Sequence, residues 1–320
     1  MQKKKKTQKK PEPPKVVVDH DLAKVEEQHN IIFKPNAGPQ TDFLAAGERE
    51  VLYGGSAGGG KSYAMLADPL RFMGHPSFSG LLLRHTTEEL RELIFKSQEM
   101  YPKIWPGIKW SERKMQWTAP SGARLWMSYL DKEDDVLRYQ GLAFSWIGFD
   151  ELTQWPTPFA WNYMRSRLRS TAHDLPVYMR ATTNPGGRGH HWVKKMFIDP
   201  AAHNKSFDAT DIETTEVLRY PAGHEKAGKA LFKRKFIPAR LADNPYLAEQ
   251  GDYEAMLLSL PEQQRRQLLD GDWDIKEGAA FTEFDRNIHV VEPFPIPSNW
   301  VKFRACDYGY GSKSGVVWFA

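Results

Sequence analysis

Cysteine is almost absent from this sequence, because Cys306 is the single one among 320 residues. A lone cysteine excludes an internal disulfide framework and fits a reducing compartment. No apolar run of about 18 residues occurs, so no membrane-spanning helix is expected. Residues 1–15 are followed by VVVDHDL instead of a long apolar segment, which argues against a secretory signal.

Charge is distributed unevenly. The formal net charge is +4, yet residues 1–15 hold seven lysines and one glutamate, so the remaining residues sum to −2. The body of the chain is therefore not basic overall, and a nucleic-acid surface would have to be local, at RSRLR (165–169) or KRK (233–235). The lysine-rich segment 1–35 is expected to be a disordered, solubilising arm, with contact to DNA or to a partner as the alternative.

Apolar strands alternate with helices in the first three quarters of the chain. Strands are expected at 50–55, 80–86, 145–151 and 177–184, and a hairpin at 114–130. The intervening helices are expected at 61–73, 87–101 and 159–170. This order predicts an α/β fold with a parallel sheet flanked by helices.

The pattern changes after the fourth strand. Residues 244–274 predict two short helices with no strand between them, and 301–320 predict two strands around a Gly-rich turn. We therefore expect an α/β domain at 36–240, a helical segment at 241–280, and a linker with the first strands of a second domain at 281–320. Because an apolar strand reaches the last residue, the chain is expected to stop inside that domain.

The stretch YGGSAGGGKSYAM, residues 53–65, carries a phosphate-binding motif of the form G-x4-G-K-[ST]. Its glycines let backbone N–H groups converge on phosphate oxygens, Lys61 would reach the β/γ-phosphates, and the Ser62 hydroxyl would ligate Mg²⁺. The preceding apolar strand and the following helix distinguish it from a Gly-rich surface turn. The expected nucleotide ligands are Gly55, Ser56, Gly58, Gly59, Gly60, Lys61 and Ser62.

The later strand IGFDE ends in two carboxylates. Asp150 would hold the Mg²⁺ through water, and Glu151 would orient the attacking water. Adjacent acids at a strand end are commonly a solvated turn, but together with the upstream phosphate loop they predict ATP hydrolysis. A glutamate beside the aspartate favours a hydrolase over a kinase, which needs no activated water.

Further polar residues are assigned to this site. Thr182, Thr183 and Asn184 end the fourth strand and could sense the γ-phosphate, with an ordinary strand-end turn as the alternative. An arginine that neutralises the transition state is worth about 10³–10⁵ in rate. Arg138 is the favoured one, acting in a neighbouring subunit, with a surface salt bridge as its alternative role. The competing arginines are Arg84 and Arg167.

Together, GGSAGGGKS, IGFDE, ATTNPGG and the run IPARLADNPYL…LPEQQRRQLLDGDWD resemble the large terminase subunit of tailed bacteriophages, over roughly residues 35–320. The resemblance implies a RecA-like P-loop ATPase that translocates double-stranded DNA into a procapsid, followed by a ribonuclease-H-type nuclease that cuts concatemeric DNA. It implies ATP and Mg²⁺ as cofactors, with Mg²⁺ or Mn²⁺ for the nuclease. Implied partners are the portal protein, the small terminase subunit and further copies of the chain in a ring, in the host cytoplasm and without a membrane.

Carried over by position, the resemblance assigns a role to each motif. The phosphate-loop pair is Lys61 and Ser62, the Mg²⁺ aspartate Asp150, the catalytic glutamate Glu151, the coupling motif Thr182, Thr183 and Asn184, and the adenine-side glutamine Gln40. Asp307, in FRACDYGYG, resembles the first metal-binding aspartate of the nuclease. One carboxylate cannot hold two metals, so nuclease activity is not expected from this chain. The loop has Ala57 where the family often has a basic residue, which leaves the arginine acting in cis open.

Two other functions stay open. A helicase or RecA-type recombination motor would need a second ATPase-like lobe, which residues 240–320 do not supply. A non-catalytic DNA-binding or capsid-interaction protein with a vestigial phosphate loop is disfavoured by the four intact motif residues, Lys61, Ser62, Asp150 and Glu151.

Overall fold

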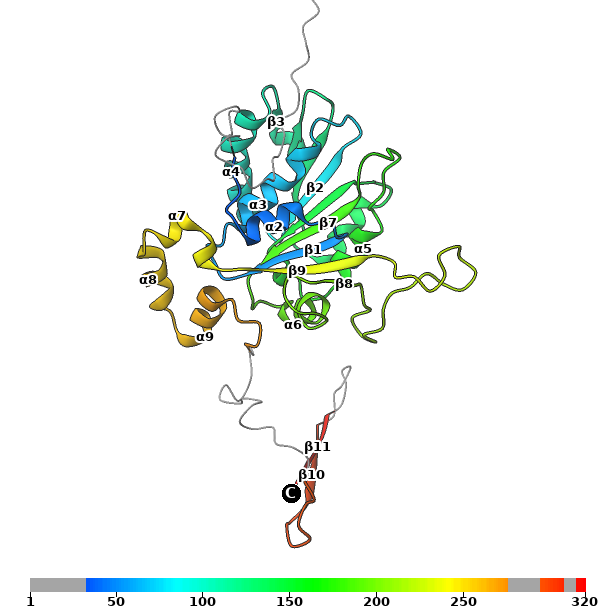
Figure 1. Ribbon diagram of the computed structural model, residues 1–320, viewed down its shortest axis with the longest axis vertical. Helices are drawn as coiled ribbons and strands as arrows, with labels where there is room; N and C mark the ends of the chain where they lie inside the picture. Colours follow the sequence, from blue (N-terminus) through cyan, green and yellow to red (C-terminus); the bar gives the residue numbers. More distant parts are fainter. Residues whose placement is uncertain (1–32, 276–293, 308–314) are drawn as a thin grey trace, which may run out of the picture. The chain divides into compact units, whose positions relative to one another are not determined.

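The computed structural model describes residues 33–275, 294–307 and 315–320 (Figure 1). These residues divide into two units, one within Met1–Glu277 and the other within Gly278–Ala320. The arm predicted at 1–35 lies almost entirely outside the described residues, and the finer division into segments stays a prediction. In the described ranges, no helix has the length and apolar character needed to cross a membrane.

The larger unit is built on a nine-stranded sheet. Its strands are β1 Glu50–Gly55, β2 Ser79–Arg84, β3 Lys109–Ser111, β4 Gln116–Thr118, β5 Arg124–Tyr129, β6 Trp146–Asp150, β7 Tyr178–Thr183, β8 Ser206–Asp208 and β9 Lys233–Ala239. Their order is β3-β4-β5-β2-β6-β7-β1-β9-β8. The six central strands β5, β2, β6, β7, β1 and β9 run parallel to one another. The strands β3, β4 and β8 are antiparallel to their neighbours. The predicted parallel α/β sheet is confirmed.

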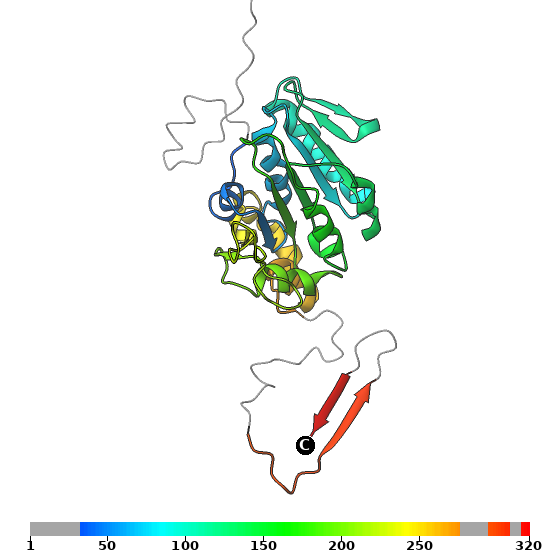
Figure 2. The same ribbon diagram turned by 90° about the vertical axis from the view of Figure 1, so that its right-hand side faces the viewer.

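Helices cover both faces of this sheet (Figures 1 and 2). They are α2 Pro39–Ala45, α3 Lys61–Ala67, α4 Thr87–Ile104, α5 Phe159–Arg165 and α6 His190–Val193, with the short 3₁₀-helices η3 Glu133–Tyr139 and η4 Leu152–Gln154. Alternation along the strands separates the two layers. In β2, Leu82 packs with α3 and α4, whereas Leu81 and Leu83 pack with α5 and α6.

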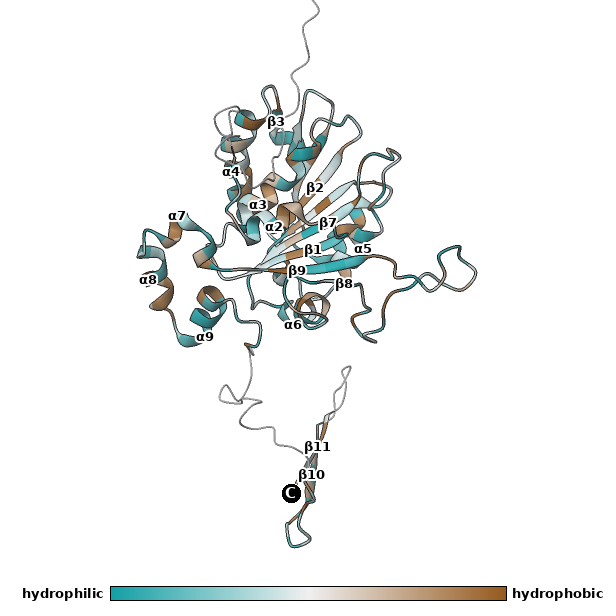
Figure 3. Ribbon diagram, in the orientation of Figure 1, coloured by the Kyte–Doolittle hydropathy of each residue, from teal (hydrophilic) through white to brown (hydrophobic). Residues whose placement is uncertain are grey.

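The sequence did not predict β9, which is the neighbour of β1. Its sequence KRKFIPA begins with charged residues, and Figure 3 colours much of it as hydrophilic. Arg234 is nevertheless 1% exposed, because it donates a hydrogen bond to the buried carboxylate of Glu50 at 2.8 Å. Arg165 pairs with the same carboxylate, and the predicted helix at 159–170 ends at this residue. Each of the two basic clusters considered for DNA binding, 165–169 and 233–235, therefore contributes one arginine to an ion pair with the buried Glu50.

Short helices follow β9 in the larger unit: α7 Pro245–Ala248, α8 Asp252–Leu258, α9 Glu262–Arg265 and the π-helical turn η7 Arg266–Asp270. No strand lies among them, as the sequence predicted. In the smaller unit, β10 Phe303–Asp307 and β11 Gly315–Phe319 pair antiparallel. Its assignment to a ribonuclease-H-type domain stays a prediction.

Candidate nucleotide-binding site

The predicted phosphate loop, Arg84, the two carboxylates and the coupling residues lie at the carboxyl ends of four adjacent parallel strands, in the order β2, β6, β7 and β1. Asp150, at the end of β6, is the register partner of Thr182 in β7, and Gly54 in β1 is the partner of Thr183. Open α/β sheets bind ligands at this edge. Segments far apart in the sequence are therefore brought to one side of the sheet.

The phosphate loop between β1 and α3 needs its glycines. Gly55, Gly58 and Gly60 have φ angles of 142°, 78° and 77°, which disfavour any residue with a Cβ. At Gly55 a Cβ would also lie 2.2 Å from the carbonyl oxygen of Ala239. The loop conformation therefore depends on glycine at these positions.

Side chains fix the direction of the loop's carbonyl groups. The pairs are Lys61 Nζ to Ser56 O at 2.5 Å, Asn244 Nδ2 to Gly58 O at 2.7 Å, the Tyr53 hydroxyl to Gly59 O at 2.6 Å, and Gln40 Nε2 to Gly60 O at 2.8 Å. In a trans peptide the N–H points opposite to the C=O. The N–H groups of Gly59, Gly60 and Lys61 therefore point away from these donors, which is the arrangement that binds phosphate oxygens.

Lys61 is the first residue of α3 and is 7% exposed. Burial lowers the pKa of its ammonium group, while the nearby carboxylates of Glu151 and Asp150 oppose that shift. Buried charges in proteins are normally paired, and here the two carboxylates compensate the charge of the ammonium group. Ser62 follows in the first turn of the same helix.

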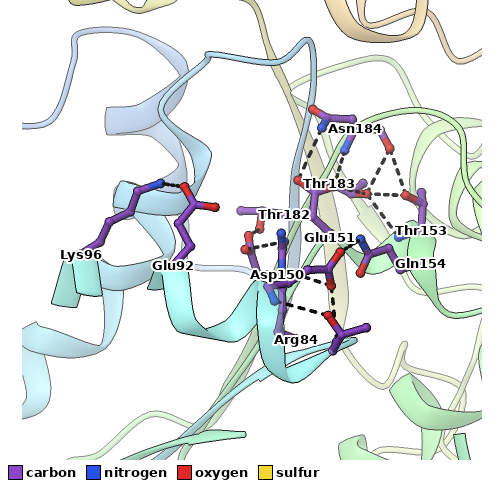
Figure 4. A network of polar contacts seen from close by, with 12 residues as sticks. Arg84, Glu92, Lys96, Asp150, Glu151, Thr153, Gln154, Thr182, Thr183 and Asn184 are labelled. Carbon is purple, nitrogen blue, oxygen red and sulfur yellow. Dashed lines mark hydrogen bonds and ion pairs between the residues drawn. The ribbon is translucent and has the colours of Figure 1, made fainter. Parts of the chain in front are cut away.

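Asp150 is held from both neighbouring strands (Figure 4). It is 1% exposed, accepts a hydrogen bond from Arg84 Nη1 at 2.7 Å, and accepts another from the Thr182 hydroxyl. Arg84 Nε also lies 3.8 Å from Glu89 Oε2, and Glu89 Oε1 accepts a bond from Gln154 Nε2 at 2.7 Å. The carboxylate is thus fixed in position by side chains that are themselves anchored.

Glu151 has a left-handed backbone, with φ 60° and ψ 56°. This conformation costs a residue with a side chain about 1–2 kcal/mol, and such strain clusters at functional sites. Its carboxylate accepts bonds from the Asn184 N–H at 3.2 Å, Asn184 Nδ2 at 3.4 Å and the Thr183 hydroxyl at 3.5 Å. Burial, and then the charge of Asp150, raise the pKa of Glu151. A raised pKa makes a carboxylate a better proton acceptor.

Three buried polar atoms around these carboxylates have no hydrogen-bond partner within the described part of the chain: Arg84 Nε, Gln154 Oε1 and Asn184 Oδ1. Buried polar atoms are normally partnered, so these atoms fit a polar ligand. The described residues contain no group of three or more His, Cys, Asp or Glu side chains able to hold a metal. Mg²⁺ commonly takes few protein ligands and completes its shell with phosphate oxygens and water, which is compatible with Ser62 and Asp150.

The other predicted residues lie outside this cluster. Gln40 is buried at the end of the phosphate loop, and its Oε1 accepts the Asn36 N–H at 2.6 Å. Arg138, in η3, is exposed and binds the Asp135 carboxylate at 3.3 Å and the Tyr129 carbonyl at 3.1 Å. Neither is brought to the two carboxylates.

Two more predictions are placed by the structure. The guanidinium of Arg167 lies over the ring of Tyr163, with 5.2 Å to the ring centre. Asp307 ends β10 in the smaller unit and is exposed. The metal-binding role of Asp307 stays a prediction.

Sequence reasoning missed Glu89 and Gln154. Thr86 and Glu89 form a capping box at the start of α4, and the pattern T-x-x-E directly after a strand is a known helix-start signal. That signal would have placed Glu89 next to Arg84. Gln154 lies one turn beyond Glu151, with its N–H donating to the Glu151 carbonyl at 3.0 Å, and nothing in its spacing indicates a role.

Comparison with protein families gives one match. The family model described as terminase large subunit, T4likevirus-type, N-terminal, matches residues 52–288. This range includes the phosphate loop, the two carboxylates and the helices after β9. Among curated proteins, none matches the chain.

Solved structures give matches at low identity. The large terminase from a thermophilic bacteriophage, in complex with ADP, aligns with a TM-score of 0.54 and 19% identity, over 89% of this chain and 64% of that chain. The same protein in complex with ATP-gamma-S aligns with a TM-score of 0.53 and 18% identity, over the same shares. The likeness shows a shared fold, and this chain spans 64% of the length of that protein.

Proposed function

Since the chain belongs to the family of T4-like large terminase subunits, we propose that it hydrolyses ATP to drive double-stranded DNA into a procapsid. The observation that carries this proposal is the position of Glu151, strained and partly buried, beside Asp150 and across β7 from the phosphate loop. A relative in complex with ADP and with ATP-gamma-S supports a nucleotide ligand.

In this proposal the loop from Gly55 to Ser62 binds the triphosphate through the N–H groups described above and through the Lys61 ammonium. Ser62 and Asp150 would hold Mg²⁺. When bound, the ion would polarise the phosphoryl oxygens and neutralise charge that develops on them. Gln40, which donates a hydrogen bond to the Gly60 carbonyl, is assigned to the adenine side because the resemblance implies that role.

Glu151 acts as the group that orients and deprotonates the attacking water. In the structure its carboxylate is held by Asn184 and Thr183, and in this proposal it exchanges the Asn184 donors for the water before hydrolysis. The residues that hold it are those assigned to coupling. Binding of ATP and loss of its γ-phosphate would in this way be transmitted to the end of β7.

Arg138 is proposed to act on the nucleotide of a neighbouring copy of the chain. It is exposed, and its contacts are with its own η3 turn and with Tyr129, so it has no role in the site of its own subunit. A ring of subunits on the portal would bring it to the neighbouring site. The small terminase subunit is a further proposed partner, and the host cytoplasm the proposed location. Asp307 is proposed to contribute to a nuclease that would use Mg²⁺ or Mn²⁺.

The test is the ATPase rate of the chain measured against its concentration, with and without DNA. A rate that rises more steeply than linearly indicates that the site is completed between subunits. Glu151→Gln should bind ATP and lose hydrolysis by about 10²–10⁴-fold. Unchanged turnover in this variant would remove Glu151 from its role.

A mixing experiment addresses Arg138. Subunits that carry Arg138→Ala keep an intact Glu151, and subunits that carry Glu151→Gln keep an intact Arg138. Mixing the two inactive variants should restore activity if the arginine acts in trans. No recovery at any mixing ratio would contradict that role.

A further inference from the structure

The residues after η7 pack directly on the phosphate loop. The carbonyl of Leu268 accepts the Ala57 N–H at 2.6 Å. A Cβ on Gly271 would lie 2.6 Å from the Ser56 nitrogen, and a Cβ on Gly54 would lie 3.4 Å from the indole ring of Trp273. The segment 268–274 is therefore in contact with the loop that is proposed to bind the phosphates.

The same segment also contacts the loop that follows the coupling residues. His190 Nδ1 accepts the Gly186 N–H at 2.8 Å, and His190 Nε2 lies 3.1 Å from the Trp273 carbonyl oxygen. The two rings stack with centres 5.3 Å apart and an interplanar angle of 23°. A backbone N–H can only donate, so Nδ1 is the acceptor and Nε2 carries the proton that it donates to Trp273.

This contact continues a series of bonds that begins at Glu151. Asn184 holds the Glu151 carboxylate through its N–H and its side-chain amide. Gly186, two residues later, is bound by His190, which is bound to Trp273. Every step in this series is a hydrogen bond or at most two residues of main chain.

We infer that His190 is a positioning residue that transmits the state of Glu151 to the helical segment 241–275. When Glu151 turns to the attacking water beside the γ-phosphate, Asn184 loses its acceptor and the end of β7 relaxes. His190 carries that change to Trp273, and from there to the helices before it. This inference rests on the proposed ATP hydrolysis and names the side chain through which that reaction moves the helical segment.

The inference separates two responses of segment 268–274. The contact with the phosphate loop should respond to any bound nucleotide, since ADP and ATP both fill the loop. The contact through His190 should respond only to the γ-phosphate, because it begins at Glu151. The difference between ATP-gamma-S and ADP therefore isolates the second contact.

Amide hydrogen exchange of the full chain measures this difference. With Mg²⁺, both nucleotides should protect residues 53–65, and exchange over residues 262–275 should differ between ATP-gamma-S and ADP. In His190→Ala, protection of 53–65 should persist, while the difference over 262–275 should fall by about fivefold, the factor that corresponds to one lost hydrogen bond.

Two conservative variants guard against a folding defect. His190→Asn keeps an acceptor near the Nδ1 position but cannot reach Trp273, whereas His190→Gln keeps a donor near the Nε2 position but loses the acceptor for Gly186. Each retains half of the contact, and each should lose the difference. Lys194→Ala is the control, because it removes the 2.7 Å ion pair with Asp274 at the same interface without touching the loop after β7.

The outcomes are distinct. The inference is supported if the three His190 variants lose the difference and Lys194→Ala keeps it. It is overturned if either conservative variant keeps the full difference, or if the unmodified chain shows protection of 53–65 but no difference over 262–275. Absence of protection at 53–65 in the unmodified chain would overturn the proposed nucleotide binding as well.

Discussion

Substitution of Gly271 by alanine tests whether the helical segment rests on the phosphate loop. Gly271 has φ 65°, and a Cβ there would lie 2.6 Å from the Ser56 nitrogen and 2.9 Å from the Gly55 carbonyl carbon. Both atoms are backbone, so neither can rotate aside. Gly251 is a matched control, because it has φ 68° and nothing within 4 Å of the Cβ position.

The two substitutions share one cost and differ in another. A left-handed conformation costs an alanine about 1–2 kcal/mol at either position. At Gly271 alone, the added methyl group collides with packed backbone, which adds about 1–3 kcal/mol. The free energy of unfolding should therefore be lower in Gly271→Ala than in Gly251→Ala by about 1–3 kcal/mol.

Urea denaturation followed by circular dichroism measures this difference. With a slope of about 3 kcal/mol/M, the midpoints of the two variants should differ by about 0.3–1 M. Nucleotide affinity, measured with a fluorescent ATP analogue, should fall in Gly271→Ala and stay unchanged in Gly251→Ala. Equal midpoints and equal affinities for the two variants would refute the contact between the segment and the loop.

Buried ionisable and hydroxyl groups give the remaining predictions. Burial alone would raise the pKa of Glu50, but Arg234 beside it holds the pKa below its usual value. The ionised Glu50 therefore stabilises the folded state above a pH of about 4.3. This stabilisation is lost as the pH falls through the lowered pKa. Glu50→Gln should cost about 3–5 kcal/mol at pH 7 and less in acid, measured by denaturation at both pH values. The raised pKa of Glu151 has the opposite effect on stability. The folded state prefers the neutral acid, so it loses stability as the pH rises from about 4.3. Glu151→Gln should therefore melt at a higher temperature than the unmodified chain at pH 7 and at the same temperature near pH 3. Tyr53→Phe and Tyr101→Phe each remove one buried hydrogen bond to a carbonyl and should each cost about 1 kcal/mol, but only Tyr53→Phe should weaken nucleotide binding.

The strands that carry the motifs were predictable because each motif directly follows an apolar run. Gly55, Asp150 and Thr183 each end a strand of five or six residues that is buried throughout. A polar residue at the end of such a run lies at the edge of the sheet, and in a parallel sheet these edges coincide. The neighbouring strand β9 could not be recognised in this way, since its buried Arg234 is compensated by Glu50, 184 residues earlier in the chain.

The contacts of the helical segment could not be predicted for a different reason. Gly271 and Trp273 lie more than 200 residues from the loop that they contact, and the fit depends on the missing side chain at Gly271. The sequence marks Gly271 only as part of the run DGDWD that carries the resemblance, and it does not indicate the contact with the phosphate loop. This contact depends on the close approach of the backbone at Gly271 to the backbone of the phosphate loop, and the pattern of neighbouring residues in the sequence does not reveal such an approach.

The roles of the three candidate arginines illustrate what exposure and contacts add to a sequence. The sequence favours Arg138 over Arg84 and Arg167, but it does not show which side chains each of the three contacts. In the structure Arg84 binds Asp150, so a role within its own subunit is the one its position allows. Arg167 lies over Tyr163. An arginine that acts on a neighbouring subunit must instead be exposed and outside its own site, and Arg138 meets both conditions. Its ion pair with Asp135 is solvent-accessible and worth about 1 kcal/mol or less, and in the proposed role the hydrogen bond to the Tyr129 carbonyl would also have to break before Arg138 reached a phosphate bound to another copy.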